Sequence, residues 1–277
     1  MKQAFREKSR ALRYALKEGC RSLISPTVIS QVCPICGSNR SMEIKYGCAD
    51  FITGPSAELP EAKSHSKYRC HRCGHLYSHW LDVGLEQVGA ITGGAYASDK
   101  SRVENFRASY QLGLQRYLLD LLGNPARAVL LDFGCGPNLS PTMTLRKEGH
   151  DARCCDIMDY PYDGEIYFRH TNDPARWKTF FDGIVSIDVI EHLGNALETF
   201  HYFNRILKPG GYMAGCFPTQ YHYRRNHPYF HNPYHVCLLS PKSLRILCKK
   251  TGFSLLKIEP FEADVPFVFL FQKTREA

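Results

Sequence analysis

Hydrophobic and polar residues follow one another after residue 126 in blocks that predict alternating strands and helices. Short apolar runs predict strands, and apolar residues three and four positions apart predict helices. The expected strands are 128–133, 152–156, 165–169, 182–187, 211–217, 254–260 and 266–273, and the expected helices lie near 139–149, 195–207 and 240–251. This alternation indicates an α/β fold whose mostly parallel sheet is covered on both faces.

The last two expected strands are joined by a link around Glu262 and Asp264 that is too short to hold a helix. Such a link suits a hairpin, because parallel neighbours need a longer crossover. One of the two strands should therefore run antiparallel to the rest. The pattern predicts a doubly wound, seven-stranded, mostly parallel sheet in a domain spanning residues 126–277.

The residues before 126 show different patterns. Residues 1–30 are basic with a weak apolar stripe and predict an N-terminal helix. Residues 31–80 are rich in Cys, His and Gly without helical periodicity, which predicts a small β module. Residues 81–125 contain a Gly-rich patch and then a helix from about Arg102 to Leu122, so they predict a helical connector or lid.

Composition and charge narrow the possible classes of protein. With 44% hydrophobic and 22% charged residues the chain can form a sizeable core, and its longest apolar run is too short to cross a bilayer. The N-terminus lacks the apolar core of a signal peptide, so we expect a cytoplasmic protein with reduced cysteines and no membrane partner. The net charge of +8 is partly concentrated in residues 1–30, which could contact nucleic acid or an anionic membrane surface, or could simply pack on the protein itself.

Two CxxC pairs predict a zinc site. Cys33 and Cys36 precede Gly37, and Cys70 and Cys73 precede Gly74. Zinc binds four thiolates in a tetrahedron, and two such turns separated by a β-rich insert are typical of a zinc ribbon. The alternative is a pair of unrelated turns with free thiols. His71 and His75 flank the second pair, and either could replace a thiolate, although a surface position is the simpler interpretation.

A Gly-rich turn follows the first expected strand of the α/β domain. The sequence LLDFGCGPN covers Leu130–Asn138, and Asp156 ends the next strand about twenty residues later. A turn of this kind lets the backbone approach a nucleotide-like ligand, while the later carboxylate can accept both hydroxyls of a ribose. A nicotinamide or flavin domain is the rival, but no third glycine completes its GxGxxG pattern.

Two further segments, DVIEHL at 188–193 and LKPGG at 207–211, stand in the expected order after the turn. With them, residues 126–277 resemble the Rossmann-like S-adenosylmethionine-dependent methyltransferases. The resemblance implies that the cofactor is held by Asp132, Gly134, Cys135, Gly136, Asp156, Asn172, Asp173 and Asp188. The family usually has a third glycine where this chain has Asn138, and asparagine can preserve such a turn by adopting a positive φ.

Acidic and histidine residues cluster after the fourth expected strand. Asp188, Glu191 and His192 would share one face of a helical turn, and His235 follows later. A similar set holds a divalent metal against a hydroxyl in ubiquinone-pathway O-methyltransferases and small-RNA 2′-O-methyltransferases. The resemblance implies a second metal at these four residues, although Asp188 is shorter than the usual Glu. Otherwise Glu191 and His192 cap the loop, and His235 contacts the substrate or acts as general base.

An aromatic and basic segment lies between the fifth expected strand and His235. Tyr221, Arg224, Arg225 and His231 belong to it, and we expect them to face the substrate. The two arginines could bind a phosphate or a carboxylate.

The sequence thus predicts a zinc-containing, S-adenosylmethionine-dependent methyltransferase that acts on oxygen, nitrogen or carbon of a small-molecule acceptor, with His192, His235 and Glu191 as candidate catalytic residues. Two alternatives stay open. One is an RNA methyltransferase that grips RNA with its ribbon and basic N-terminus. The other is a non-catalytic binding module that has kept the fold.

Overall fold

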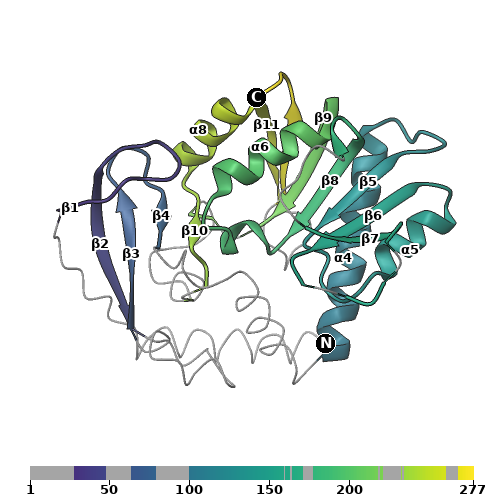
Figure 1. The fold of residues 1–277 in the computed structure, drawn as a ribbon, viewed down its shortest axis with the longest axis horizontal. Coiled ribbons are helices and arrows are strands. Elements are labelled where there is room, and N and C mark those ends of the chain that lie inside the picture. The colour runs from purple at the N-terminus through teal and green to yellow at the C-terminus, as the bar shows by residue number, and fades with distance from the viewer. Residues whose placement is uncertain are drawn as a thin grey trace.

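A computed structural model describes residues 28–47, 64–78, 100–158, 160–162, 164–170, 177–217, 219–220, 232, 234–259 and 268–277. In this part of the chain two β-sheets lie side by side, one of seven strands and one of five (Figure 1). Of the predicted N-terminal helix only residues 28–30 are described, and they form a strand; the predicted Gly-rich patch lies outside the described residues.

The seven-stranded sheet confirms the predicted fold class. Its strands are β5 (Val129–Phe133), β6 (Asp151–Asp156), β7 (Tyr167–Arg169), β8 (Phe181–Ile187), β9 (Leu207–Cys216), β11 (Phe253–Glu259) and β12 (Val268–Lys273). They are ordered β11-β12-β9-β8-β5-β6-β7. Strand β12 pairs antiparallel with both β9 and β11, and the pairs formed by β5 to β9 are parallel, as the short link at the end of the sequence predicted.

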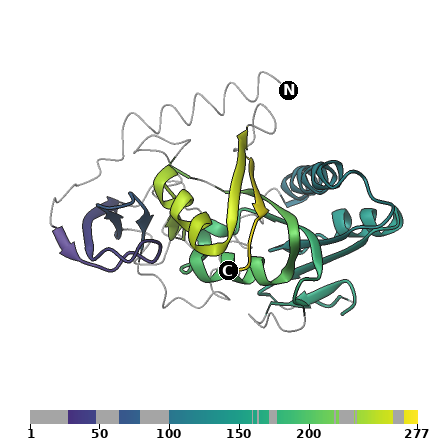
Figure 2. The same cartoon turned by 90° about the horizontal axis from the view of Figure 1, so that it is seen from above.

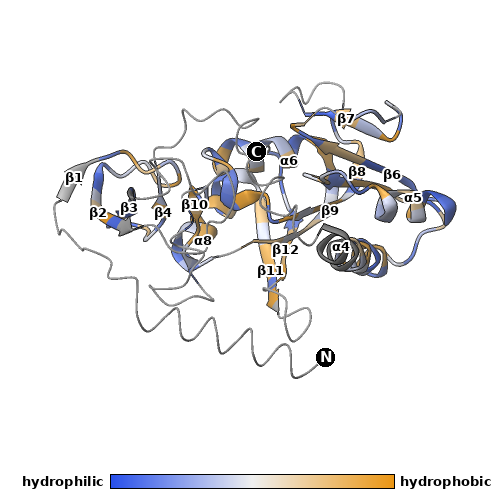
Figure 3. Cartoon of the chain, turned by 90° about the horizontal axis from the view of Figure 1, so that it is seen from below, coloured by the Kyte–Doolittle hydropathy of each residue, from blue (hydrophilic) through white to orange (hydrophobic). Residues whose placement is uncertain are grey.

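Helices cover both faces of this sheet (Figure 3). They are α4 (Lys100–Leu121), α5 (Ser140–Lys147), α6 (Ala196–Ile206) and α8 (Pro241–Thr251). Successive side chains of a strand point to opposite faces. Accordingly, Ile184 of β8 joins a core with α6 and α8, whereas the next residue, Val185, joins a core with Leu114 and Leu118 of α4. The apolar strands read from the sequence are therefore buried on two sides.

Local sequence signals explain where α8 begins and ends. Ser240 caps its start, because the Ser240 hydroxyl accepts from the Ser243 amide at 3.0 Å while the Ser243 hydroxyl accepts from the Ser240 amide at 2.8 Å. Gly252 ends it with a φ of 74°. A glycine is required there, since an added β-carbon would stand 2.5 Å from the carbonyl oxygen of Arg275.

The five-stranded sheet is antiparallel and joins distant parts of the chain. Its strands are β1 (Val28–Ser30), β2 (Arg40–Gly47), β3 (Ser64–Cys70), β4 (Leu76–Tyr77) and β10 (Cys237–Leu238), in that order. Strands β2, β3 and β4 belong to the predicted zinc-ribbon-like module, whereas β1 lies just before it, in residues predicted to be helical. Strand β10 follows β9 of the seven-stranded sheet after twenty residues and pairs with β4. No sequence pattern predicted this fifth strand.

The module and the larger domain share one hydrophobic core. A single buried cluster contains Ile35 of the module together with Leu244 and Leu247 of α8. The Lys250 ammonium on α8 also donates to the Ile35 carbonyl at 2.8 Å. Seen from above, the purple strands of the module stand beside the yellow-green helix α8 (Figure 2). In the described ranges, no helix combines the length and apolar character needed to cross a bilayer.

Candidate functional site

The glycine turn after β5 is fixed by the end of β6. The amides of Gly134 and Cys135 both donate to the Cys155 carbonyl, at 2.8 and 3.1 Å, and the Gly136 amide donates to Asp156 Oδ2 at 2.9 Å. Gly134 and Gly136 have φ values of 78° and 64°, which favour glycine. The structure therefore brings the predicted turn and the predicted ribose carboxylate into direct contact.

Asn138 preserves the turn in a different way from the one expected. Asn138 is described, but it is not among the non-glycine residues that have a positive φ, so its backbone does not take the conformation expected of a third glycine. Its side-chain Oδ1 accepts from the Ser140 amide at 3.0 Å instead, at the start of α5. This bond forms an Asx turn that satisfies the amide of the first helical residue, whereas the N-cap position itself is occupied by Leu139.

Asp132 supplies a buried carboxylate just before the turn. Its side chain is 1% exposed. Burial, followed by the charge of Asp156, raises the pKa of Asp132 to about 8, while a hydrogen bond donated by Gln111 of α4 opposes the rise. A cationic group beside Asp132 would favour its ionised form. Sequence reasoning missed Gln111, because nothing in the α4 pattern distinguishes it from other polar helix positions.

The segment after β8 carries the second part of the site. Asp188 has a φ of 51°, a conformation that is uncommon for a residue with a side chain and that clusters at functional sites. The 3-10 turn η5 (Ile190–His192) follows at once. It buries Glu191, which is 1% exposed, beside His192.

Three of the four predicted second-metal ligands come together. Glu191, His192 and His235 each offer a ligand atom, and these atoms lie within 4.8 Å of one another. The two imidazole rings have centroids 5.0 Å apart. Asp188 lies outside this group of described residues, so the expected four-residue set is reduced to three. We refer to Glu191, His192 and His235 as the His–Glu cluster.

Hydrogen bonds fix both imidazoles. His192 Nδ1 lies 3.0 Å from the Tyr234 carbonyl oxygen, and because a carbonyl only accepts, this nitrogen carries the proton. In the neutral ring, His192 Nε2 then keeps a lone pair for a proton or a metal. The Asn232 side-chain amide donates to His235 Nε2 at 3.2 Å. Asn232 and Tyr234 thus orient the two rings.

The four cysteines of the two CxxC turns, which we call knuckles, form a compact group. The first knuckle lies between β1 and β2, and the second joins β3 to β4. The Sγ atoms of Cys33 and Cys73 are 3.6 Å apart, those of Cys36 and Cys70 are 3.5 Å apart, and all four lie within 4.8 Å of one another. Tetrahedral Zn–S bonds of about 2.3 Å would place neighbouring sulfurs about 3.8 Å apart. The donor set and spacing therefore fit a zinc ion.

The two knuckles have matching backbone geometry. The Gly37 amide donates to the Cys33 carbonyl at 2.9 Å, as the Gly74 amide does to the Cys70 carbonyl. A hydrogen bond from Cys73 lowers the pKa of the Cys33 thiol to about 5, and hydrogen bonds from two backbone amides add to this effect. Burial acts in the opposite direction and raises this pKa.

The histidines beside the second knuckle differ from each other. His71 is exposed, as expected. His75 is not a surface residue: it is 1% exposed and stacks on Tyr77 with ring centroids 5.4 Å apart. Burial lowers the pKa of His75 to about 3, so it is a neutral core residue. Neither histidine belongs to a metal-ligating group of the described residues.

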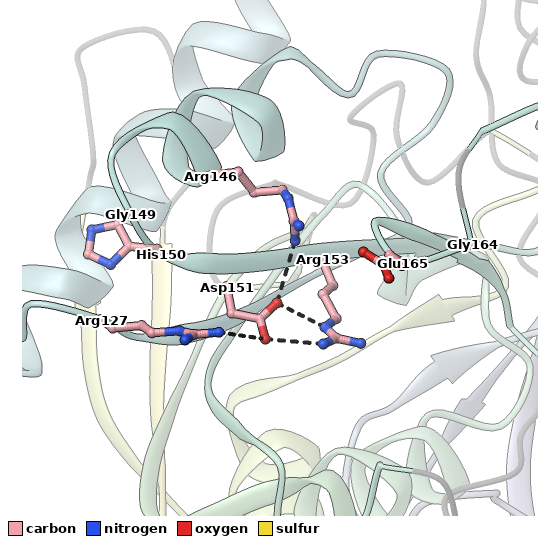
Figure 4. Close-up of a pocket in the computed structure, with 8 residues that line it drawn as sticks. All are labelled: Arg127, Arg146, Gly149, His150, Asp151, Arg153, Gly164 and Glu165. Atoms are coloured by element: carbon pink, nitrogen blue, oxygen red, sulfur yellow. Dashed lines mark hydrogen bonds and ion pairs between the residues drawn. The ribbon is translucent and has the colours of Figure 1, made fainter.

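A polar pocket of about 370 Å³ lies at the opposite ends of β5 and β6 from the glycine turn. In it the side chains of Arg127, Arg146 and Arg153 point toward the single carboxylate of Asp151 (Figure 4). Arg153 contacts Asp151 Oδ1 through Nε at 3.0 Å, and its guanidinium stands over the Trp177 ring at 4.9 Å. These ion pairs connect the beginnings of β5 and β6. They lie away from the glycine turn and from the His–Glu cluster.

Several predicted site residues cannot be placed. Asn172 and Asp173, expected near the adenine, lie outside the described residues, as do the expected substrate-facing residues Tyr221, Arg224, Arg225 and His231. Cys20 and Cys48 also lie outside them. The other non-knuckle cysteines, at positions 135, 154, 155, 216, 237 and 248, are buried with free thiols, as expected.

Comparisons with known proteins agree with this geometry. Residues 106–258, more than half of the chain, match a family model described as a methyltransferase domain. No curated protein matches the sequence. Among solved structures, the chain resembles the 1,6-didemethyltoxoflavin-N1-methyltransferase of Burkholderia thailandensis, solved with 1,6-didemethyltoxoflavin and S-adenosylhomocysteine bound, at 15% identity over 74% of this chain and 97% of that chain, with a TM-score of 0.52. A SAM-dependent methyltransferase from Archaeoglobus fulgidus shares 17% identity over 61% of this chain and 97% of that one, with a TM-score of 0.48.

Proposed function

We infer the acceptor of this protein from its identity: the chain belongs to the methyltransferase-domain family and is an S-adenosylmethionine-dependent methyltransferase. Its acceptor is a small molecule that is activated by the His–Glu cluster. The observation that carries the proposal is the burial of that cluster beside the glycine turn. Glu191 is 1% and His235 5% exposed. Groups with so little exposed surface are more accessible to a small acceptor than to a large folded partner.

The methyl donor is assigned to the glycine turn and the carboxylates on either side of it. S-adenosylmethionine supplies an electrophilic methyl group on a sulfonium. Asp132 would balance positive charge on the donor, Asp156 would accept from its ribose hydroxyls, and Gly134 and Gly136 would allow its close approach. In the described structure Asp156 already accepts from the amides of Gly136 and Met158, so its carboxylate is held in place before any ligand arrives.

The acceptor's proton is assigned to the two histidines. Methyl transfer is an in-line displacement, so orientation carries much of the rate. When the acceptor forms its bond to the methyl carbon, the sulfonium becomes a neutral thioether and the acceptor must release a proton. His192 Nε2, on the ring whose Nδ1 is held by the Tyr234 carbonyl, would accept it. A divalent metal held by Glu191, His192 and His235 would be a second way to lower the acceptor's pKa.

Zinc at Cys33, Cys36, Cys70 and Cys73 completes the proposal. Four thiolates leave no open coordination position, so this ion would stabilise the module without taking part in the reaction. A cytoplasmic location, where thiols stay reduced, suits such a site and remains a prediction.

RNA is the second candidate acceptor. It is favoured by the exposed basic side chains of Arg40, Lys45 and Arg72 on the module, against the single described carboxylate of Glu43. Binding of an RNA oligonucleotide that weakens steeply with salt, and further weakens when these three residues are neutralised, would support it over the small-molecule acceptor.

Calorimetry with S-adenosylhomocysteine tests the donor site. We expect binding by the wild-type protein and a loss of at least tenfold in affinity for Asp156→Ala, with no change for Asp120→Ala, an exposed carboxylate on α4. Unchanged affinity in Asp156→Ala would refute the assignment. Incubation of the loaded enzyme with a metabolite extract and labelled donor then tests the acceptor class, since label should enter small molecules and not RNA.

A further inference from the structure

Lys67 links the N-terminal module to the segment that carries the histidines. It lies on β3 and its side chain is 0% exposed. Its ammonium donates to the backbone carbonyls of Asn232 at 2.9 Å and His235 at 2.6 Å, residues that follow it by 165 and 168 positions. A buried lysine of the N-terminal module thus holds the carbonyls of two residues at the His–Glu cluster, one of which, His235, is a member of it.

Arg69 makes a matching contact at the other end of the same segment. Two residues along a strand share one side, so Arg69 points the same way as Lys67. Its guanidinium donates to Gln220 Oε1 at 2.9 Å, and the Gln220 amide donates in turn to the carbonyls of Gly74 at 2.7 Å and Leu238 at 2.8 Å. Strand β3 therefore contacts the connection between β9 and β10 at two places. Arg69 binds Gln220 near the end of β9, and Lys67 binds Asn232 and His235 near the start of β10.

The burial of Lys67 has an energetic cost that its contacts offset. Transfer of an ammonium into the protein interior is unfavourable, and burial lowers the pKa of Lys67 to about 7. An apolar side chain would fill the same space without that cost. Charge-assisted hydrogen bonds to carbonyls compensate for it and at the same time fix the carbonyl directions, which an apolar side chain cannot do.

The carbonyls that Lys67 holds belong to residues that orient both imidazoles. Asn232 donates to His235 Nε2 and accepts from the Tyr234 amide at 2.9 Å, while the Tyr234 carbonyl accepts from His192. A shift of this short segment would move both rings. We infer that Lys67 is a positioning residue of the methyl-transfer site, through which the N-terminal module sets the orientation of His192 and His235. The inference rests on the proposed role of these histidines.

Nuclear magnetic resonance of ¹⁵N-histidine-labelled full-length protein tests the inference without knowledge of the acceptor. Lys67→Met keeps the length of the side chain but removes its donors. We expect the ring-nitrogen signals of His192 and His235 to shift, and hydrogen exchange over residues 234–239 to accelerate at least tenfold. Lys67→Arg should restore much of the wild-type pattern, and Lys242→Met, the same substitution at an exposed position of α8, should alter nothing.

Separate measurements distinguish positioning from general support of the fold. S-adenosylhomocysteine affinity of Lys67→Met should stay within twofold of wild type. Wild-type histidine signals and exchange in this variant would overturn the inference, and so would a uniform rise in exchange over the whole chain together with a loss of donor affinity. If Lys67→Met does not fold, Arg69→Met tests the second contact between β3 and the connection from β9 to β10. Hydrogen exchange should then accelerate only in the chain around Gln220 and Leu238. Failure of the wild type to bind S-adenosylhomocysteine would refute the proposed function instead.

Discussion

Gly134 and Val189 are in such close contact that a β-carbon on Gly134 would stand 2.2 Å from Val189 Cγ2. Gly134 belongs to the turn after β5, and Val189 lies directly before η5. The turn proposed to hold the methyl donor and the segment that leads to the His–Glu cluster therefore meet at one point where no side chain fits. If the proposed sites are correct, this contact sets the spacing between them.

Gly134→Ala should abolish measurable binding of S-adenosylhomocysteine, because the clash and the φ of 78° together displace the turn. Calorimetry of the purified variant checks this. Gly252→Ala is the matched control: its β-carbon would meet Arg275 at 2.5 Å in a similar conformation, but far from the turn, so it should lower Tm while leaving donor affinity unchanged. Val189→Ala added to Gly134→Ala should restore part of the binding, and absence of any restoration would show that the clash is not the cause.

Asp132→Asn should stabilise the ligand-free protein at high pH while weakening donor binding. Burial, then the charge of Asp156, raises the pKa of Asp132 from 3.8 to about 8. The folded protein thus holds a proton that the unfolded chain has released, so the stability contributed by this group is present below pH 4 and is lost as the pH rises through 8. Asparagine does not titrate.

The stability difference between Asp132→Asn and wild type should therefore grow by about 2 kcal/mol between pH 6 and pH 8, since one pKa unit corresponds to about 1.4 kcal/mol. Urea unfolding at several pH values measures it. Donor affinity should fall at least tenfold at pH 8, where wild-type Asp132 can ionise beside a cationic ligand. A stability difference that is constant with pH would contradict the buried-carboxyl explanation.

Cys33→Ser should remove most of the tightly bound zinc. One of four thiolates is lost, and a hydroxyl is a poor ligand for this ion. Metal analysis after dialysis is expected to give close to one zinc per wild-type chain and a small fraction of that in the variant. Cys248→Ser serves as the control, because Cys248 is buried in α8 outside the knuckles. It should lose stability but keep its zinc. Equal zinc content in all three proteins would rule out the four-cysteine site.

Zinc removal should also destabilise the chain next to the His–Glu cluster, although the zinc ligands do not contact that cluster. The Ser240 hydroxyl donates to the Cys73 carbonyl, and β4 pairs with β10 two residues after His235. A chelator strong enough to extract zinc should therefore accelerate hydrogen exchange in β10 before it affects β5 and β6. If exchange in β5 and β6 accelerates to the same extent, the coupling is global unfolding.

The secondary structure could be predicted well because each element has a local cause. Apolar runs produced β5, β6 and β8 within one or two residues, and Ser240 and Gly252 marked the ends of α8. The antiparallel β12 followed from the length of one link. Strand β10 could not be predicted, because its two residues pair with β4 across about 160 positions and have no pattern of their own.

The fold class, the glycine turn with Asp156, and the group of four cysteines could be predicted from the chain alone, because they depend on spacing along the chain and on fixed residue chemistry. Tertiary contacts were needed to show that His75 is buried, that Asp188 does not join the His–Glu cluster, and that Lys67 reaches the segment of His235. Each of these depends on which strands meet and on the exclusion of water where they do. Such contacts join residues too far apart in the chain for any local pattern to encode.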